Sequence, residues 1–205
     1  MNRSYMKGII YTGEAIIDHK LLAMLPKELQ AFLRQHNGVV AYFGGLHIRG
    51  CCAEPAWHSL REAWQGEQAL QKTYDTVLKI DIPFAQDCVG NQFLLRQGEV
   101  VFLDTETGEI APLEVDFKHF LIGAEKFPVD ALGLEPLRRW QQQGEVLAPG
   151  QLLHVYPPVC IAATTDKATL TPVSVPKRMA FLADLYRQIK HLPNGQSLTI
   201  KPLQD

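Results

Sequence analysis

The sequence predicts an α+β fold in which an antiparallel sheet, built as a meander, is flanked by helices. Apolar residues recur at helical spacing toward both ends of the chain, whereas strand-forming runs separated by tight turns occupy its middle. The chain has 205 residues, of which 46% are apolar and 20% are charged. A chain of this length can bury a substantial core, so we expect an ordinary globular protein.

Two helices are expected before the first strand. The first covers residues 14–24, and the second begins near Pro26 and ends at Asn37-Gly38. In both segments apolar residues recur every three or four positions and therefore line one face. Proline suits the first turn of a helix, and glycine tolerates the positive φ with which many helices end.

Strands and helices alternate in the next segment. Gly44-Gly45 separates two short runs of strand formers, and Trp57, Leu60 and Trp64 fall on one helical face. We expect strands over 39–43 and 46–49, followed by helices over 55–65 and 67–74.

The meander is the most clearly marked part of the sequence. A strand that ends at Pro83 precedes it. Gln97-Gly98 then forms a two-residue turn and residues 105–108 form a second turn, so that consecutive strands pair antiparallel. The expected elements are strands over 77–82, 91–96, 99–103 and 109–113, and a helix over 116–121.

The last part of the chain is expected to form an additional α/β extension. We treat residues 1–125 as one domain and residues 126–205 as a C-terminal extension packed on the same core. The extension should hold helices over 134–144 and 176–189 and strands over 152–156, 159–163, 169–173 and 197–200.

Composition argues against several classes of protein. Lysine and arginine number 20 against 22 acidic residues, and a net charge of −2 argues against direct binding of nucleic acid. No stretch approaches the roughly 20 apolar residues that cross a bilayer, and the apolar run 8–11 is too short for a signal peptide. The cysteines form no C-x-x-C pair, which favours reduced thiols in a cytoplasmic protein. Cys88 and Cys160 are interpreted as small buried residues.

Motifs for catalysis and metal binding are absent from the sequence. It contains no G-x-S-x-G, H-E-x-x-H, Walker or G-x-G-x-x-G segment. His47 and His58 flank Cys51-Cys52, but this spacing fits no zinc pattern with paired ligands. We therefore expect no catalytic residue, no metal and no cofactor. A Cys-His or Ser-His pair brought together in space stays open as an alternative.

Charge is unevenly distributed along the chain. Between Gln97 and Phe117 the sequence has six acidic residues and no lysine or arginine. One interpretation is a solvated sheet face whose charges keep its edges from aggregating. The other is an acidic patch that recruits a basic protein partner. The candidate partner-binding residues are Glu99, Asp104, Glu106, Glu109, Glu114 and Asp116.

Two further segments bear on binding. Phe43 and Leu46 combine apolar side chains with the Gly44-Gly45 turn, which makes this segment a second candidate interaction loop. On the last helix basic residues outnumber the single Asp184, and we interpret them as a solvated outer face. They are Lys177, Arg178, Arg187 and Lys190.

Three motifs occur in a distinctive order. They are Leu25-Pro26-x-Glu28-Leu29-x-x-Phe32-Leu33-x-x-x-Asn37-Gly38, then Ile82-Pro83-Phe84-Ala85-x-Asp87-x-x-Gly90-Asn91-Gln92-Phe93, and then Phe117-x-x-Phe120-Leu121. In this order they resemble the SUKH superfamily, which includes the fungal Smi/Knr-type cell-wall regulators and many bacterial immunity proteins. The resemblance covers about residues 20–125. In physical terms, we expect Asp87 to bond backbone amides in its turn, with Gly90-Asn91 in left-handed positions.

The resemblance implies a SUKH-like fold and a non-catalytic binding protein. Its bacterial branch implies a cytoplasmic immunity protein that neutralises a cognate toxin, nuclease toxins being prominent, by covering the toxin. A basic toxin domain would suit the acidic stretch, because nucleases must hold phosphates. The alternatives are a regulatory or scaffolding module that binds a housekeeping partner and, third, an enzyme. The oligomeric state is not predicted.

Overall fold

The computed structural model describes residues 6–161, 168–192, 200 and 203. Its main feature is a seven-stranded sheet in which each strand pairs antiparallel with the next strand along the chain. This sheet and its flanking helices confirm the predicted α+β fold. The strands are β1 (Tyr11–Thr12), β2 (Val39–Ala41), β3 (Leu46–Ile48), β4 (Ile82–Asp87), β5 (Gln92–Arg96), β6 (Glu99–Leu103) and β7 (Ile110–Asp116).

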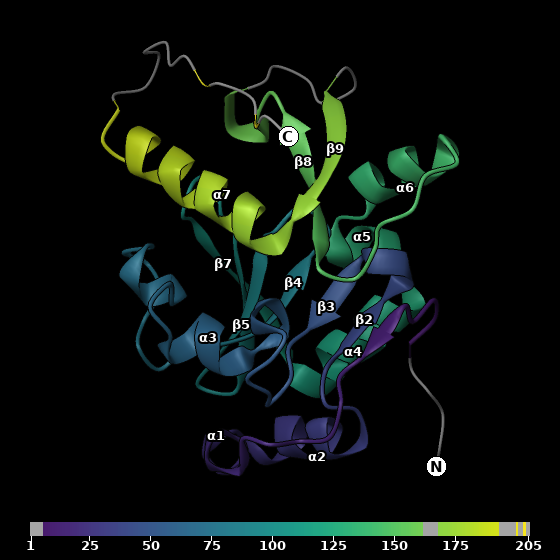
Figure 1. The fold of residues 1–205 in the computed structure, drawn as a ribbon. Coiled ribbons are helices and arrows are strands. Elements are labelled where there is room, and N and C mark those ends of the chain that lie inside the picture. The colour runs from purple at the N-terminus through teal and green to yellow at the C-terminus, as the bar shows by residue number, and fades with distance from the viewer. Residues whose placement is uncertain (1–5, 162–167, 193–199, 201–202, 204–205) are drawn as a thin grey trace.

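Helices surround the sheet. They are α1 (His19–Met24), α2 (Lys27–Gln35), α3 (Leu60–Gln65), α4 (Phe117–Lys126), α5 (Pro128–Leu132), α6 (Glu135–Gln142) and α7 (Val175–Ile189). Short 3-10 turns are η1 (Tyr42–Gly44), η2 (Ala56–His58), η3 (Leu70–Lys72) and η4 (Val159–Ile161). Figure 1 shows α7 in front of the upper part of the sheet and α1 and α2 below it. In the described part of the chain, no helix is both long enough and apolar enough to cross a bilayer.

Alternate residues of the meander face two different cores. Phe93 belongs to the main core, where its ring lies 4.7 Å from that of Phe120 on α4. Its neighbour Leu94 points to the other face and packs in a smaller cluster with Val101 and with Tyr186 of α7. This alternation is the two-residue period of a strand covered on both faces.

The chain after α4 adds a two-stranded sheet, β8 (Gln151–Tyr156) and β9 (Thr169–Ser174), and the long helix α7. The N–H of Leu153 in β8 donates to the carbonyl of Cys88, 2.8 Å away. The side chain of Leu153 is fully buried and belongs to the main core, as do Leu137 and Leu147. Residues on both sides of position 125 therefore share one apolar cluster.

Several sequence-based boundaries are wrong in the first half of the chain. The first helix begins at His19, because Asp18 caps it by accepting from the N–H of Leu21. The helix expected over 55–65 is broken, since Ser59 caps α3 with its hydroxyl group. The helix expected over 67–74 is reduced to the 3-10 turn η3.

Strand boundaries also differ. No strand covers 77–81: Asp81 accepts from the N–H of Leu78 in a turn, and β4 begins at Ile82 and continues through Pro83. The segment expected as a strand over 159–163 begins with η4. The final strand expected over 197–200 lies outside the described residues except for Ile200.

Two turns agree with the sequence analysis. Gln97 and Gly98 both have positive φ, 54° and 94°, as a two-residue turn between antiparallel strands requires. Asp87 accepts at one carboxylate oxygen from the N–H groups of Val89, Gly90 and Asn91, over 2.8 to 2.9 Å. The expected role of Asp87 as a turn-building residue is confirmed. Of the two positions expected to be left-handed, Gly90 has a positive φ of 104°, whereas Asn91 does not, so that part of the prediction is wrong.

Candidate functional site

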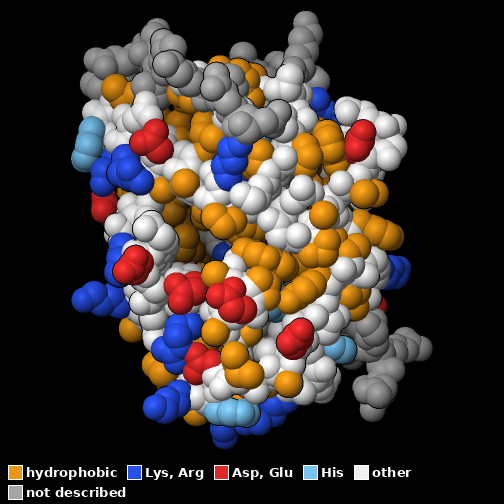
Figure 2. Space-filling view, viewed as in Figure 1, with side chains coloured by type: hydrophobic (Ala, Val, Ile, Leu, Met, Phe, Trp, Pro, Cys, Tyr) orange, Lys and Arg blue, Asp and Glu red, His pale blue; other side chains and the backbone are white. Residues whose placement is uncertain are grey.

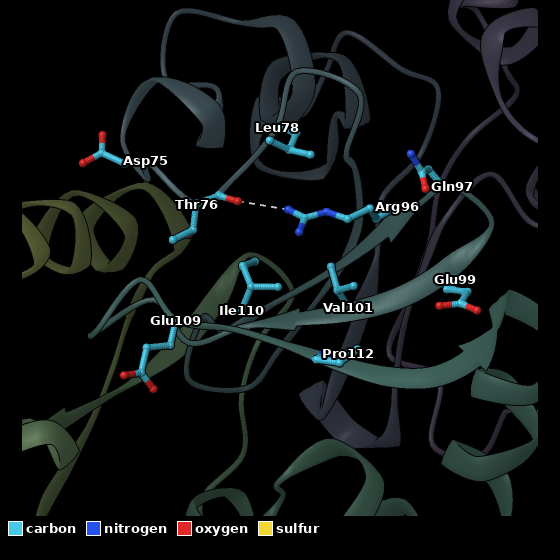
Figure 3. A pocket seen from close by; sticks show the side chains of 10 residues that line it. All are labelled: Asp75, Thr76, Leu78, Arg96, Gln97, Glu99, Val101, Glu109, Ile110 and Pro112. Carbon is cyan, nitrogen blue, oxygen red and sulfur yellow. Dashed lines mark hydrogen bonds between the residues drawn. The ribbon is translucent and has the colours of Figure 1, made fainter.

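An open groove of about 1000 Å³ lies beside β6 and β7 (Figure 3). Its floor consists of Val101, Ile110 and Pro112, and Thr76 and Leu78 stand on the opposite wall. Leu78 keeps 47% of its surface exposed. The groove is therefore a depression of mixed lining, with an apolar floor and a polar rim.

The wall of the groove is held in place by polar contacts. The guanidinium of Arg96 bonds both carboxylate oxygens of Asp81, at 2.9 and 2.7 Å, and donates to the carbonyl of Thr76 at 3.0 Å. Asp81 is buried, and the hydroxyl of Thr76 donates to the carbonyl of Gly108 at 2.6 Å. These contacts tie the segment after η3 to both β5 and the β6–β7 turn.

Charges around the groove are partly neutralised inside the chain. Arg96 is paired with Asp81, and Asp75 is paired with Lys190, which directly follows α7, 2.9 Å away. The hydrogen bond from Lys190 lowers the pKa of Asp75. Glu99 and Glu109 are exposed, and neither carboxylate forms an ion pair with any described residue. Two uncompensated negative charges therefore lie near the groove. Figure 3 shows Glu99 near one end of its floor and Glu109 near the other, with the Glu109 side chain directed away from the wall formed by Thr76 and Leu78.

The remaining acidic candidates have other surroundings. Glu106 is buried, lies 3.7 Å from Arg178 and accepts from the N–H of Cys160. Asp104 accepts from the N–H of Glu106 at 2.8 Å and so builds the β6–β7 turn. Glu106 therefore cannot contribute to an exposed acidic surface.

The end of β7 holds the last two acidic candidates. Asp116 caps α4 by accepting from the N–H of His119 at 2.8 Å, and it pairs with the His119 ring. These bonds lower the pKa of Asp116. Glu114 is exposed and has a φ of 56° where the pairing of β6 and β7 is irregular.

The two candidate residues of the loop around Gly44-Gly45 also differ in exposure. Phe43 is 57% exposed, whereas Leu46 is fully buried in β3 and cannot contact a partner. Tyr42 and Phe43 both have positive φ, 53° and 57°, which bulky side chains rarely adopt. The ring of Phe43 lies so close to Gly8 that a Cβ there would approach it to 2.6 Å.

Arg178 was expected on a solvated face, and this prediction is wrong. Its side chain is 1% exposed. It donates to the carbonyl of Val89 and contacts Nδ1 of His154, both at 2.9 Å, and it faces Glu106. Desolvation lowers the pKa of the Arg178 guanidinium and lowers that of His154 to about 4.

The two central histidines belong to a buried polar chain. Nε2 of His58 bonds the carbonyl of Asn37, and His47 Nε2 bonds His58 Nδ1, both at 2.9 Å. Because the carbonyl can only accept, His58 must carry its proton on Nε2, and His47 must donate from Nε2 in turn. His47 Nδ1 then accepts from Gln86, whose oxygen accepts from Arg49. Burial lowers the pKa of both histidines, so both are neutral links in this chain.

Neither the histidines nor the cysteines assemble a metal site in the described part of the structure. No group of three His, Cys, Asp or Glu side chains there could hold an ion. Cys88 is buried as expected, whereas Cys160 is exposed, so its interpretation as a buried residue is wrong.

On the face that carries α3, neither positive nor negative side chains predominate. Figure 2 shows acidic and basic side chains mixed over α3 and hydrophobic side chains gathered across the middle of this view. A strongly charged partner would therefore find no uniform surface over α3, in contrast to the groove with its two free carboxylates.

Comparisons with known proteins show where the chain has relatives. The SMI1 / KNR4 family (SUKH-1) matches residues 16–123. Among solved structures, the chain is similar to Atu4351 from Agrobacterium tumefaciens, with a TM-score of 0.52 and 11% identity over 85% of each chain. This likeness concerns the fold, and it extends over more of the chain than the family match does. No curated protein matches the sequence.

Proposed function

The chain belongs to the SMI1 / KNR4 family (SUKH-1), and we propose that it is a non-catalytic immunity protein of the cytoplasm. In this proposal it binds one cognate toxin domain, basic because it acts on nucleic acid, and neutralises it by covering its active cleft. Nucleases hold phosphates with basic side chains, so such a cleft is positively charged.

The proposal rests mainly on one observation: two carboxylates without an ion-pair partner lie next to a groove with an apolar floor. Leu78, Ile110 and Pro112 offer apolar surface that gains from burial, and the exposed Glu99 and Glu109 supply the charge. Opposite charges at the rim of an interface speed association and select the partner, while burial of the apolar centre contributes most of the affinity.

The non-catalytic part of the proposal is supported by the state of the buried histidines. His47 and His58 are the most prominent titratable pair, yet both are buried and bonded at both ring nitrogens. Neutral histidines whose nitrogens are all engaged have no free position for a substrate proton.

Co-expression tests the proposal directly. The genes beside that of the chain are searched for a toxin-like domain, the chain is produced together with that domain, and growth of the host cells is measured. We expect the wild-type chain and the control Glu145→Lys, which changes an exposed loop residue, to protect the cells. The double variant Glu99→Lys/Glu109→Lys should protect them less. Lack of protection by the wild-type chain, or its stable binding to a housekeeping protein instead, would favour the regulatory alternative.

A further inference from the structure

We infer that the groove beside β6 and β7 binds the turn 78–81 of a second copy of this chain, so that two copies form a symmetric dimer. Each copy supplies one turn and receives one, which makes the contact isologous. The inference goes beyond the proposed function and does not depend on it, because no toxin takes part in this contact.

Residues 78–81 form a tight turn with an unusual sequence. The N–H of Asp81 donates to the carbonyl of Leu78 at 3.0 Å, which leaves Lys79 and Ile80 at the centre of the turn. Glycine, proline, asparagine, aspartate and serine dominate such turns. Ile80 is nevertheless 56% exposed, and Leu78 is 47% exposed. Two large apolar side chains thus face solvent on either side of a lysine.

The backbone of this turn is fixed within the chain itself. The buried carboxylate of Asp81 accepts from the N–H of Leu78 at 2.7 Å and from the guanidinium of Arg96. The indole Nε1 of Trp64 donates to the carbonyl of Lys79 at 3.1 Å. A rigid turn loses little conformational freedom when it binds, so the burial of its apolar side chains contributes more to affinity.

The groove next to the turn offers a complementary apolar surface. Figure 3 shows Leu78 on one side of the groove and Ile110 and Pro112 on the other. Pro112 is exposed and Ile110 is partly exposed, so both gain from burial against Ile80 of another copy.

Charge favours a second copy as the occupant of the groove. Lys79 and Glu99 are both exposed, and neither forms an ion pair with any described residue. Glu99 lines the groove, so a turn that enters the groove brings its lysine toward this carboxylate. In a two-fold arrangement Lys79 of each copy faces Glu99 of the other, and two pairs of opposite charge form at once.

The dimer covers the apolar surface that the proposed function assigns to the toxin, so the two kinds of binding exclude each other. The contact is limited to one turn and one groove in each copy, and interfaces of small size are weak. We therefore expect the dimer to predominate only at protein concentrations of about 100 μM and above.

Sedimentation equilibrium of the full chain tests the inference without any added ligand. The apparent mass is measured from about 10 μM to about 1 mM protein, the range in which a weak contact becomes visible. We expect the mass to rise from that of one chain toward that of two for the wild-type chain and for the control Glu145→Lys. Lys79→Glu and Glu99→Lys should each weaken the dimer about tenfold, because one reversal disrupts both pairs of a symmetric contact.

A mixture of the two charge-reversed chains gives the sharpest result. When the Lys79→Glu and Glu99→Lys chains are mixed in equal amounts, opposite charges face each other in both pairs again. A mixed dimer should then form with the affinity of the wild-type dimer. Ile80→Ser should also weaken the dimer. Ile17→Ser, which changes an isoleucine that is 63% exposed and does not line the groove, should not. Denaturant unfolding of each variant shows whether its fold is retained.

A wild-type chain that stays monomeric at about 1 mM would overturn the inference. Dimers that persist in Lys79→Glu and Ile80→Ser would also overturn it, as would a mixture that associates no better than the single variants, because the contact would then lie elsewhere. These measurements involve no toxin. Their failure therefore leaves the proposed function as it stands, and a failure of toxin neutralisation leaves the dimer as it stands.

Discussion

Arg178 of α7 lies 3.7 Å from Glu106 in the turn between β6 and β7, and both side chains are buried. The same guanidinium also donates to the carbonyl of Val89, in the turn that Asp87 builds. One side chain of the C-terminal helix thus contacts two turns of the meander. This contact holds α7 over the face of the sheet that borders the groove.

Removal of Arg178 should strongly destabilise the fold. Arg178→Met leaves the buried carboxylate of Glu106 without its positive partner, and we expect the free energy of unfolding to fall by about 3 kcal/mol. The double variant Arg178→Met/Glu106→Gln should recover at least about 1 kcal/mol of this loss, because neither position then carries a buried charge. Denaturant unfolding is measured for the wild-type chain, for Arg178→Met, for Glu106→Gln and for the double variant. A double variant whose loss equals the sum of the two single losses would contradict the pairing.

Stability should fall on mild acidification. The folded-state pKa is about 4 for His154 and below the ordinary value for His47 and His58. As pH falls from about 6.5 toward 4, the unfolded chain binds protons that the folded chain does not, so the free energy of unfolding decreases. Asp87, whose folded pKa is raised to about 6, opposes this trend between about 4 and 6. The fall should therefore be clearest just above pH 6.

Unfolding measured between about pH 7.5 and pH 6 checks this expectation, with His154→Asn as the comparison. This variant should show a shallower decline than the wild-type chain. Stability that does not change over this range would mean that the buried histidines keep their ordinary pKa values.

Two glycines of the meander allow the cost of backbone strain to be compared with the cost of a packing clash. Gly98 and Gly108 both have positive φ, 94° and 75°. A Cβ on Gly98 would meet nothing within 4 Å, whereas one on Gly108 would lie 2.3 Å from the ring of Tyr186. Gly98→Ala should therefore cost about 1 kcal/mol, and Gly108→Ala clearly more. Equal losses in thermal or denaturant unfolding would show that α7 does not pack against this turn.

Substitution of the exposed Phe43 is expected to affect the free energy of unfolding and the binding of the partner in opposite directions. Asparagine tolerates a positive φ better than phenylalanine, so Phe43→Asn should raise the free energy of unfolding by up to about 1 kcal/mol. If the loop contacts the partner, the same change should weaken binding of the toxin-like domain. A variant that is more stable and binds as well as the wild-type chain would exclude this loop from the interface.

The sequence is informative wherever local chemistry decides the structure. The Gln97-Gly98 turn, the Asp87 turn and the stop of α2 near Asn37 depend on neighbouring residues and were all predictable. Asn37, which follows the end of α2, also makes contacts with distant residues. Its side chain donates to the carbonyl of Glu14 and accepts from the N–H of Cys51, contacts that no local pattern reveals.

The sequence-based predictions are wrong where contacts between distant segments determine the burial of a residue. Arg178 sits among polar positions of an amphipathic helix, and only the three-dimensional placement of Glu106 and Val89 explains its burial. The sequence alone shows that residues 99–116 contain acidic residues and no basic ones. Asp116 is engaged by α4, which follows it directly, but the pairing of Glu106 depends on α7, which contacts the stretch only in space.

The most direct test of the proposed function is the salt dependence of binding between the chain and a toxin-like domain, sought among the genes beside its own. Affinity is measured over a range of ionic strength for the wild-type chain, Glu99→Lys/Glu109→Lys and Glu145→Lys. We expect the wild-type chain and Glu145→Lys to lose affinity as salt rises, and the double variant to bind about tenfold more weakly with a flatter dependence. Equal affinity and equal salt dependence for all three proteins would show that the groove and its free carboxylates are not the binding site.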